Sequence, residues 1–105
     1  MPGETAHGEL WWALIDKRRP VIVVSRDDLR GVRGQTTVAV ITRTIRGIPS
    51  EVPLDDRDGL SEPSVVNCDV LETIEKSRLE RRIGRLSTSK LEELHEALAF
   101  ALQLT

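Results

Sequence analysis

Arg19 is the residue whose type and setting most clearly indicate a chemical role. It precedes Pro20 and a run of four aliphatic residues, Val21-Ile22-Val23-Val24. A continuous apolar run of mostly β-branched residues predicts a strand that is buried on both faces. Proline suits the first position of such a strand and holds the preceding residue in an extended conformation. The sequence therefore places a guanidinium on a stiff backbone at the edge of a buried sheet, where it is suited to binding an anion.

The basic residues of the chain gather in groups, although its formal net charge is −2. For nucleic-acid binding, the distribution of charge matters more than the sum. An ordinary solvated surface position is the simpler interpretation for any single arginine. Several of them stand where strands are expected to end, so folding can bring them together. The groups are residues 17–19, then Arg26, Arg30 and Arg33, then Arg43 and Arg46, and finally Arg78, Arg81, Arg82 and Arg85.

Length and composition predict one globular domain that covers residues 1–105. Hydrophobic residues make up 39% and charged residues 30% of the chain, which is typical of a folded rather than a disordered protein. The longest apolar run is too short to span a membrane, and residues 1–7 resemble a flexible tail rather than a signal peptide. We therefore expect a cytoplasmic protein. The single cysteine, Cys68, excludes an internal disulfide and a cysteine-rich metal site, and we expect no cofactor.

Short strand patterns, rich in β-branched and aromatic residues, follow one another along most of the chain. The tight polar connection at residues 16–18 predicts that the first two strands form a hairpin. Pro53 favours an edge position for the fourth strand. The expected strands are 9–15, 20–25, 36–42, 51–54, 64–70 and 82–86, with short helical turns at 26–29, capped by Ser25, and at 76–79.

The last part of the chain predicts an amphipathic helix. Ser89 and Glu92 have the spacing of a capping box, and a stripe of leucines follows. The helix is expected to run from about residue 90 to 103. Short strands followed by one such helix predict a mainly β fold with a strongly curved antiparallel sheet, or partly open barrel, against which the helix packs.

Several short motifs occur in a fixed order between Gly8 and Leu104. They are Gly8-Glu9-Leu10-Trp11-Trp12, Arg19-Pro20 with its strand, a strand ending at Thr42, Ser64-Val65-Val66-Asn67-Cys68-Asp69, Thr73-Ile74, and Gly84-Arg85-Leu86 before the helix. Each is weak alone, but together they resemble the MazF/PemK family of toxin ribonucleases. The resemblance implies the SH3-like barrel of the plasmid toxins, a homodimer, and metal-independent cleavage of single-stranded RNA at short sequences. It also implies an antitoxin partner whose tail occupies the RNA groove.

The resemblance assigns catalytic roles to Arg19, Thr42 and Asp69, with Asp69 matching a carboxylate that some members use as a base. In the family the ribose 2′-hydroxyl attacks the phosphate, which leaves a 2′,3′-cyclic phosphate and a 5′-hydroxyl. Arginine stays charged in proteins, so Arg19 is assigned to stabilising the pentavalent phosphorane. Without the resemblance, Thr42 is more simply a strand-end hydroxyl, and Asp69 is equally well a turn residue. His7 and His95 are expected on a tail and a helix, which argues against a paired-histidine mechanism.

Other residues are candidates for contact with RNA. Trp11 and Trp12 can stack bases, but neighbouring residues of a strand face opposite sides, so at least one is expected in the core. Glu9 is more simply an outward-facing strand residue, although it matches a family position near the groove. The expected RNA-binding residues are Glu9, Lys17, Arg18, Arg43 and Asn67.

Three departures from the family pattern leave the proton transfers and the cleavage motif open. Only residues 16–18 remain of a longer loop before the Arg-Pro pair, and Asn67 and Glu72 stand where some relatives have arginine. Two other function classes remain as alternatives. One is a toxin of the same fold that contacts a topoisomerase, although the chain lacks the C-terminal Trp-Gly-Ile of those proteins. The other is a catalytically inactive RNA-binding module, against which the presence of Arg19 and Thr42 argues.

Overall fold

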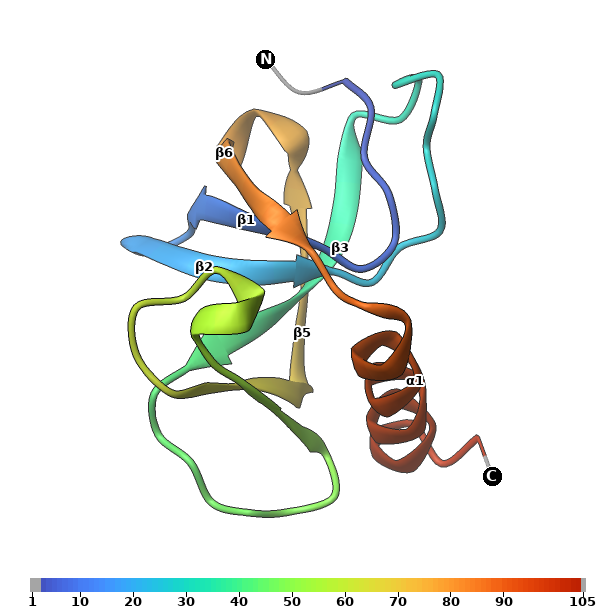
Figure 1. Ribbon diagram of the computed structural model, residues 1–105. Helices are drawn as coiled ribbons and strands as arrows, with labels where there is room; N and C mark the ends of the chain where they lie inside the picture. Colours follow the sequence, from blue (N-terminus) through green and yellow to red (C-terminus); the bar gives the residue numbers. More distant parts are fainter. Residues whose placement is uncertain (1–2, 105) are drawn as a thin grey trace.

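The computed structural model describes residues 3–104 and shows one six-stranded antiparallel sheet with one α-helix (Figure 1). The strands lie in the order β4-β5-β3-β2-β1-β6. The sheet curls into a partly open barrel with the helix against it, which confirms the predicted fold class. The elements are β1 (Glu9–Leu14), β2 (Arg18–Val23), β3 (Gln35–Thr42), β4 (Glu51–Leu54), β5 (Ser64–Glu75), β6 (Leu79–Arg85) and α1 (Thr88–Ala101), with short 3-10 turns at Asp56–Asp58 and Lys76–Arg78.

Strand β2 lies inside the sheet and is buried on both faces, as its sequence predicts. It pairs with β1 on one side and with β3 on the other. Ile22 packs into a core shared with Leu94 and Ala97 of α1. Val21 and Val23 pack into a second core on the opposite face, and all three β2 side chains are fully buried. Because side chains alternate along a strand, a slip of one residue would exchange Ile22 with the two valines between the two cores.

Strand β5 continues to Glu75, well beyond the predicted end at residue 70. Its ladder with β3 shifts register between Ala39 and Val40, which pair with Leu71 and Asn67. The intervening residues 68–70 form a bulge, and a bulge bends a strand and increases its twist. Residues 68–70 have no partners in β3, and the pairing between β3 and β5 continues from Leu71 to Glu75. A three-residue turn then returns the chain directly into β6, which begins earlier than predicted.

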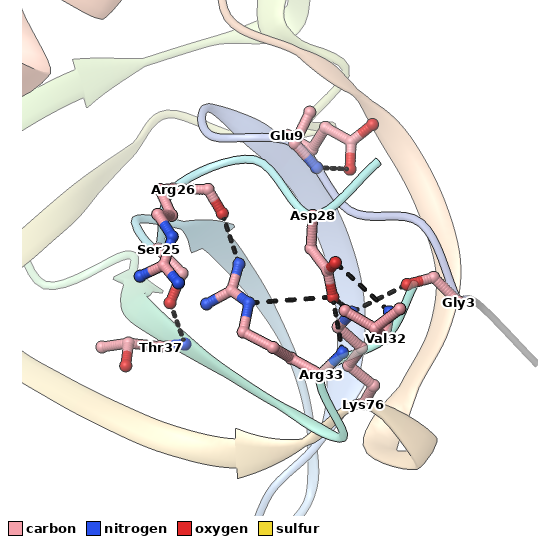
Figure 2. A network of polar contacts seen from close by, with 10 residues as sticks. Gly3, Glu9, Ser25, Arg26, Asp28, Val32, Arg33, Thr37 and Lys76 are labelled. Carbon is pink, nitrogen blue, oxygen red and sulfur yellow. Dashed lines mark hydrogen bonds and ion pairs between the residues drawn. The ribbon is translucent and has the colours of Figure 1, made fainter. Parts of the chain in front are cut away.

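Two predicted helix caps are wrong. Ser87, rather than Ser89, is the N-cap of α1, and its side chain accepts a hydrogen bond from the backbone N–H of Lys90 (3.3 Å). Ser25 caps no helical turn. Its hydroxyl accepts a hydrogen bond from the backbone N–H of Thr37 (2.7 Å) and ties the β2–β3 loop to β3 (Figure 2). No helix within residues 3–104 is long and apolar enough to cross a membrane.

A buried ion pair between Asp28 and Lys76 joins three segments at one end of the barrel (Figure 2). Lys76 Nζ also donates to the backbone oxygen of Gly3 (2.7 Å), and the backbone groups of Thr5 and Asp28 bond to each other. Thr5 is almost fully buried. The expected flexible tail is therefore anchored over residues 3–7, while residues 1–2 lie outside the described part of the chain.

The Asp28 carboxylate also organises the β2–β3 loop. It accepts hydrogen bonds from the backbone N–H groups of Val32 (3.3 Å) and Arg33 (3.0 Å). The hydrogen bond from Lys76, followed by these backbone donors, lowers the pKa of Asp28 to about 2 against the opposing effect of burial. The folded protein therefore favours the charged carboxylate more strongly than the unfolded chain does.

We expect the Asp28–Lys76 pair to make the free energy of unfolding depend on pH in the acidic range. A pKa lowered from 3.8 to about 2 contributes stability above pH 4, and this contribution is lost as the pH falls towards 2. Asp28→Asn should lower the urea midpoint at pH 6 and should differ much less from the wild type near pH 2. Asp56→Asn, at an exposed position, is the control. An equal loss of midpoint in Asp28→Asn at both pH values would contradict this account.

Candidate active site

A groove of about 610 Å³ lies where the β1–β2 turn, the end of β3 and the segment before β5 meet. Its lining combines apolar side chains, hydroxyls and positive charges, which suits a ligand with both apolar and anionic parts. The lining residues are Trp12, Lys17, Arg18, Arg19, Pro20, Ile41, Thr42, Arg43, Thr44, Leu60, Ser61, Glu62 and Ser64. Five residues predicted for catalysis or RNA binding are in this set: Lys17, Arg18, Arg19, Thr42 and Arg43.

Arg19 and Thr42 occupy corresponding places on neighbouring strands. The β2–β3 register pairs Val21 with Val40, and Arg19 and Thr42 each lie two residues further towards the same end of the sheet. Since side chains alternate with a period of two, both project from the same face. Both residues are partly exposed, so a ligand can reach them. The pairing of strands thus brings a guanidinium and a hydroxyl together at one groove.

Asp16 holds the Arg19 guanidinium in place. Arg19 Nε donates to Asp16 Oδ1 (2.8 Å), and Nη2 donates to Oδ2 (3.1 Å), which makes a two-point contact. The hydrogen bond from Arg19 holds the pKa of Asp16 well below its usual range, and the same bond raises the pKa of Arg19. A paired carboxylate fixes the planar guanidinium and also competes with any anion that approaches it.

Thr42 Oγ1 accepts a hydrogen bond from the backbone N–H of Thr44 (3.1 Å). This bond uses the hydroxyl oxygen as an acceptor and leaves its proton available for donation. Glu51 holds the loop that follows Thr42. Its Oε1 accepts hydrogen bonds from the backbone N–H groups of Arg46 (3.0 Å) and Gly47 (2.9 Å). Burial raises the pKa of Glu51, but these bonds outweigh it and leave the pKa below its ordinary value. The buried carboxylate therefore stays charged and keeps the loop in place.

Two exposed ion pairs border the rest of the groove. Arg43 pairs with Glu62 across its two walls. Arg18 pairs with Glu80 of β6 (3.2 Å), and its guanidinium lies over the ring of Trp12, 5.2 Å from the ring centroid. Trp12 pairs with Pro20 in the β1–β2 register, so Trp12 and Arg18 project from the face opposite to Arg19. The groove therefore adjoins both faces at the end of the sheet.

Three predicted site residues do not line this groove. The Asp69 carboxylate accepts a hydrogen bond from the Ser50 hydroxyl (2.6 Å), and Asn67 is buried with its side-chain oxygen bonded to the backbone N–H of Asp69 (3.0 Å). Glu9 accepts hydrogen bonds from the N–H of Ala6 and the indole of Trp11, and it pairs with Arg82. Each of these three polar side chains therefore has hydrogen-bond partners within the folded chain.

The two histidines lie together, although the sequence places one on a tail and the other on a helix and argues against a paired-histidine mechanism. His7 Nε2 and His95 Nε2 are 2.8 Å apart, and the rings are stacked. Neither histidine lines the groove. Within residues 3–104, no cluster of three or more His, Cys, Asp or Glu side chains is placed to hold a metal ion.

Sequence reasoning missed Asp16 and Glu62 as site residues. The sequence places Asp16 in a short turn, and the signal for its contact is the three-residue spacing to Arg19 across that turn. No local signal marks Glu62, because its partner Arg43 lies 19 residues away in the chain.

Comparison with known proteins gives a consistent result over almost the whole chain. The sequence profile of the family described as "PemK-like, MazF-like toxin of type II toxin-antitoxin system" matches residues 6–102. Endoribonuclease MazF3 of Mycobacterium tuberculosis is 45% identical over 92 residues, which cover 88% of this chain and 89% of that protein.

Solved structures of similar proteins share the fold. The M. tuberculosis toxin MazF-mt6 has a TM-score of 0.88 at 42% identity and covers 92% of this chain and 98% of its own. A mycobacterial endoribonuclease in complex with its cognate antitoxin has a TM-score of 0.85 at 26% identity and covers 96% and 97%. The similarity thus spans the sheet, the groove and the helix together.

Removing the carboxylate of Asp16 should strengthen the binding of a small anion at Arg19. We expect Asp16→Asn to bind inorganic phosphate roughly fivefold more tightly than the wild type, because an exposed competing charge is gone. The measurement is an NMR titration that follows the Arg19 side-chain Nε–H signal. Glu96→Gln, which makes the same charge change on an exposed face of α1, should leave the affinity unchanged. Equal affinities of Asp16→Asn and wild type would show that Asp16 does not compete with anions.

Proposed function

Because the chain belongs to the PemK-like, MazF-like toxins of type II toxin–antitoxin systems, we propose that it cuts single-stranded RNA at the groove that Arg19 and Thr42 border. The chain is an endoribonuclease of the MazF type. The observation that carries the proposal for its site is the placement of a guanidinium and a hydroxyl on the same face of paired strands. Relatives that are named for ribonuclease activity support RNA, rather than a topoisomerase, as the target.

Cleavage proceeds by attack of the ribose 2′-hydroxyl on the adjacent phosphorus. The 2′-oxygen loses its proton as its bond to phosphorus forms, and the 5′-oxygen takes up a proton as its bond to phosphorus breaks. The products are a 2′,3′-cyclic phosphate and a 5′-hydroxyl. Because the nucleophile belongs to the substrate, the protein has to position the phosphate and stabilise the charge that develops on it.

Arg19 supplies the charge stabilisation in this mechanism. Its guanidinium remains positive at all physiological pH values and binds the non-bridging oxygens of the phosphorane. Asp16 orients the guanidinium before the substrate arrives. The Thr42 hydroxyl donates a hydrogen bond to the same oxygens, while its own oxygen accepts one from the backbone N–H of Thr44. We assign Asp69 no contact with this phosphate, since it lies outside the groove.

The remaining parts of the proposal concern partners and consequences. A similar mycobacterial endoribonuclease binds a cognate antitoxin, and we propose that an antitoxin also neutralises this chain by laying an acidic C-terminal segment in the groove. Lys17, Arg18 and Arg43 give that segment, or RNA, its positively charged contacts. The chain acts as a homodimer in the cytoplasm, recognises a short sequence, and stops translation and growth when it is released from the antitoxin.

The purified protein is expected to cut RNA in excess EDTA and to leave 5′-hydroxyl ends that can be mapped by sequencing. Arg19→Ala should lower kcat on the order of 10²- to 10³-fold, as the loss of one charge-stabilising donor does elsewhere. Thr42→Val, which keeps the shape but removes the hydroxyl, should lower it about 10-fold or more.

Arg30→Ala removes an exposed arginine outside the groove and should cut RNA like the wild type. All variants should keep the circular dichroism spectrum and urea midpoint of the wild type. A requirement for magnesium, or 5′-phosphate ends, would reject the proposed chemistry. Full activity of Arg19→Ala would reject the proposed site.

A further inference from the structure

The two tryptophans at the start of the chain have different environments. Trp11 is 8% exposed, belongs to the second core, and donates its indole N–H to Glu9 (3.1 Å). Trp12 is only half-buried and lines the groove. Burial explains Trp11, but it does not explain why a large aromatic ring is placed at the groove surface beside it. Large aromatic rings at such surfaces present a flat face to ligands.

The outer face of Trp12 is covered by a side chain that can move. The Arg18 guanidinium lies over the ring and is held by Glu80, but both members of this ion pair are about half exposed, with side-chain exposures of 55% and 43%. Exposed cation–π contacts and exposed ion pairs are weak. A planar guanidinium also stacks on nucleobases as readily as on an indole. Arg18 is therefore suited to lift from Trp12 and to cover a base that enters beneath it.

The position of this pair relative to Arg19 also matters. Trp12 lies directly across from Pro20, the residue that follows Arg19, while Arg18 precedes Arg19. The stacking face and the phosphate-binding guanidinium thus flank the same strand end from opposite faces of β2. In a nucleotide the base and the phosphate likewise extend from the ribose in different directions. One nucleotide can therefore bridge the strand end.

We propose that Trp12 and Arg18 form a stacking clamp that holds a nucleobase of the substrate next to the phosphate bound at Arg19. This inference rests on the proposed function, because it names how that groove binds a base. The clamp accepts any base with a flat π-face, so it supplies affinity and position rather than reading of base edges. Trp12 is the floor of the clamp, Arg18 is its lid, and Glu80 keeps the lid aligned.

The clamp can be tested by binding alone, with ligands that cannot be cut. The probes are single-stranded 2′-O-methyl dodecamers of adenine, cytosine or uracil, and a dodecamer of the same backbone without bases. The wild type should bind the base-bearing strands on the order of 5- to 100-fold more tightly than the abasic strand. Trp12→Leu, which keeps an apolar side chain but no π-face, should remove most of this difference. Trp12→Phe should retain most of it.

Two further variants separate the clamp from the phosphate site. Arg19→Ala should weaken base-bearing and abasic strands by the same factor, because it contacts phosphate only. Arg18→Gln should reduce the preference for bases more than Arg18→Lys does. An undiminished preference for bases in a folded Trp12→Leu variant, or no preference in the wild type, would overturn the clamp. Neither result bears on whether the protein cuts RNA, which the EDTA and 5′-end experiments decide separately.

Discussion

The register of β2 between its two neighbours is the constraint on which the site depends. Val21 and Val23 fill one core and Ile22 fills the other, so neither face of the strand can turn towards water. A slip of one residue against β3 would exchange the faces of every β2 side chain. The same slip would move Arg19 away from Thr42. Core packing therefore fixes the relation between the two groups that we assign to the phosphate.

Most of the fold was predictable because its signals are local. The apolar run after Pro20, the β-branched residues before Thr42 and the leucine stripe of α1 each specify an element through composition and period. The order of these elements led to the MazF/PemK resemblance, which the family match confirms. The errors lie where several local solutions compete. Ser87 and Ser89 are both acceptable caps, and the chain alone does not show that a bulge at residues 68–70 lets β5 continue.

The parts that the sequence did not reveal depend on contacts between distant residues. The Asp28–Lys76 pair spans 48 positions and the His7–His95 contact spans 88. The hydrophobic periodicity of the sequence does not predict such pairs, because they form only when the sheet has folded. The same limit applies to the site. Arg19 and Thr42 were predictable as candidates through the family pattern, whereas the long-range contacts of Asp69 with Ser50 and of Glu9 with Arg82 form only in the folded sheet.

The acidic net charge of the chain is consistent with RNA binding once the groove is considered pair by pair. Three arginines at the groove each have a carboxylate partner in the free protein. The pairs are Arg18 with Glu80, Arg19 with Asp16, and Arg43 with Glu62. The pairs of Arg18 and Arg43 are substantially exposed, so they are weak and can be exchanged for a phosphate at little cost, whereas the two-point contact of Arg19 with Asp16 competes more strongly. RNA thus has to replace carboxylates rather than fill an open positive surface.

A polyanion that makes only one contact gains little from that exchange, whereas a strand that places several phosphates and a stacked base in register gains from each. The groove can therefore favour well-fitted single strands over polyanions in general.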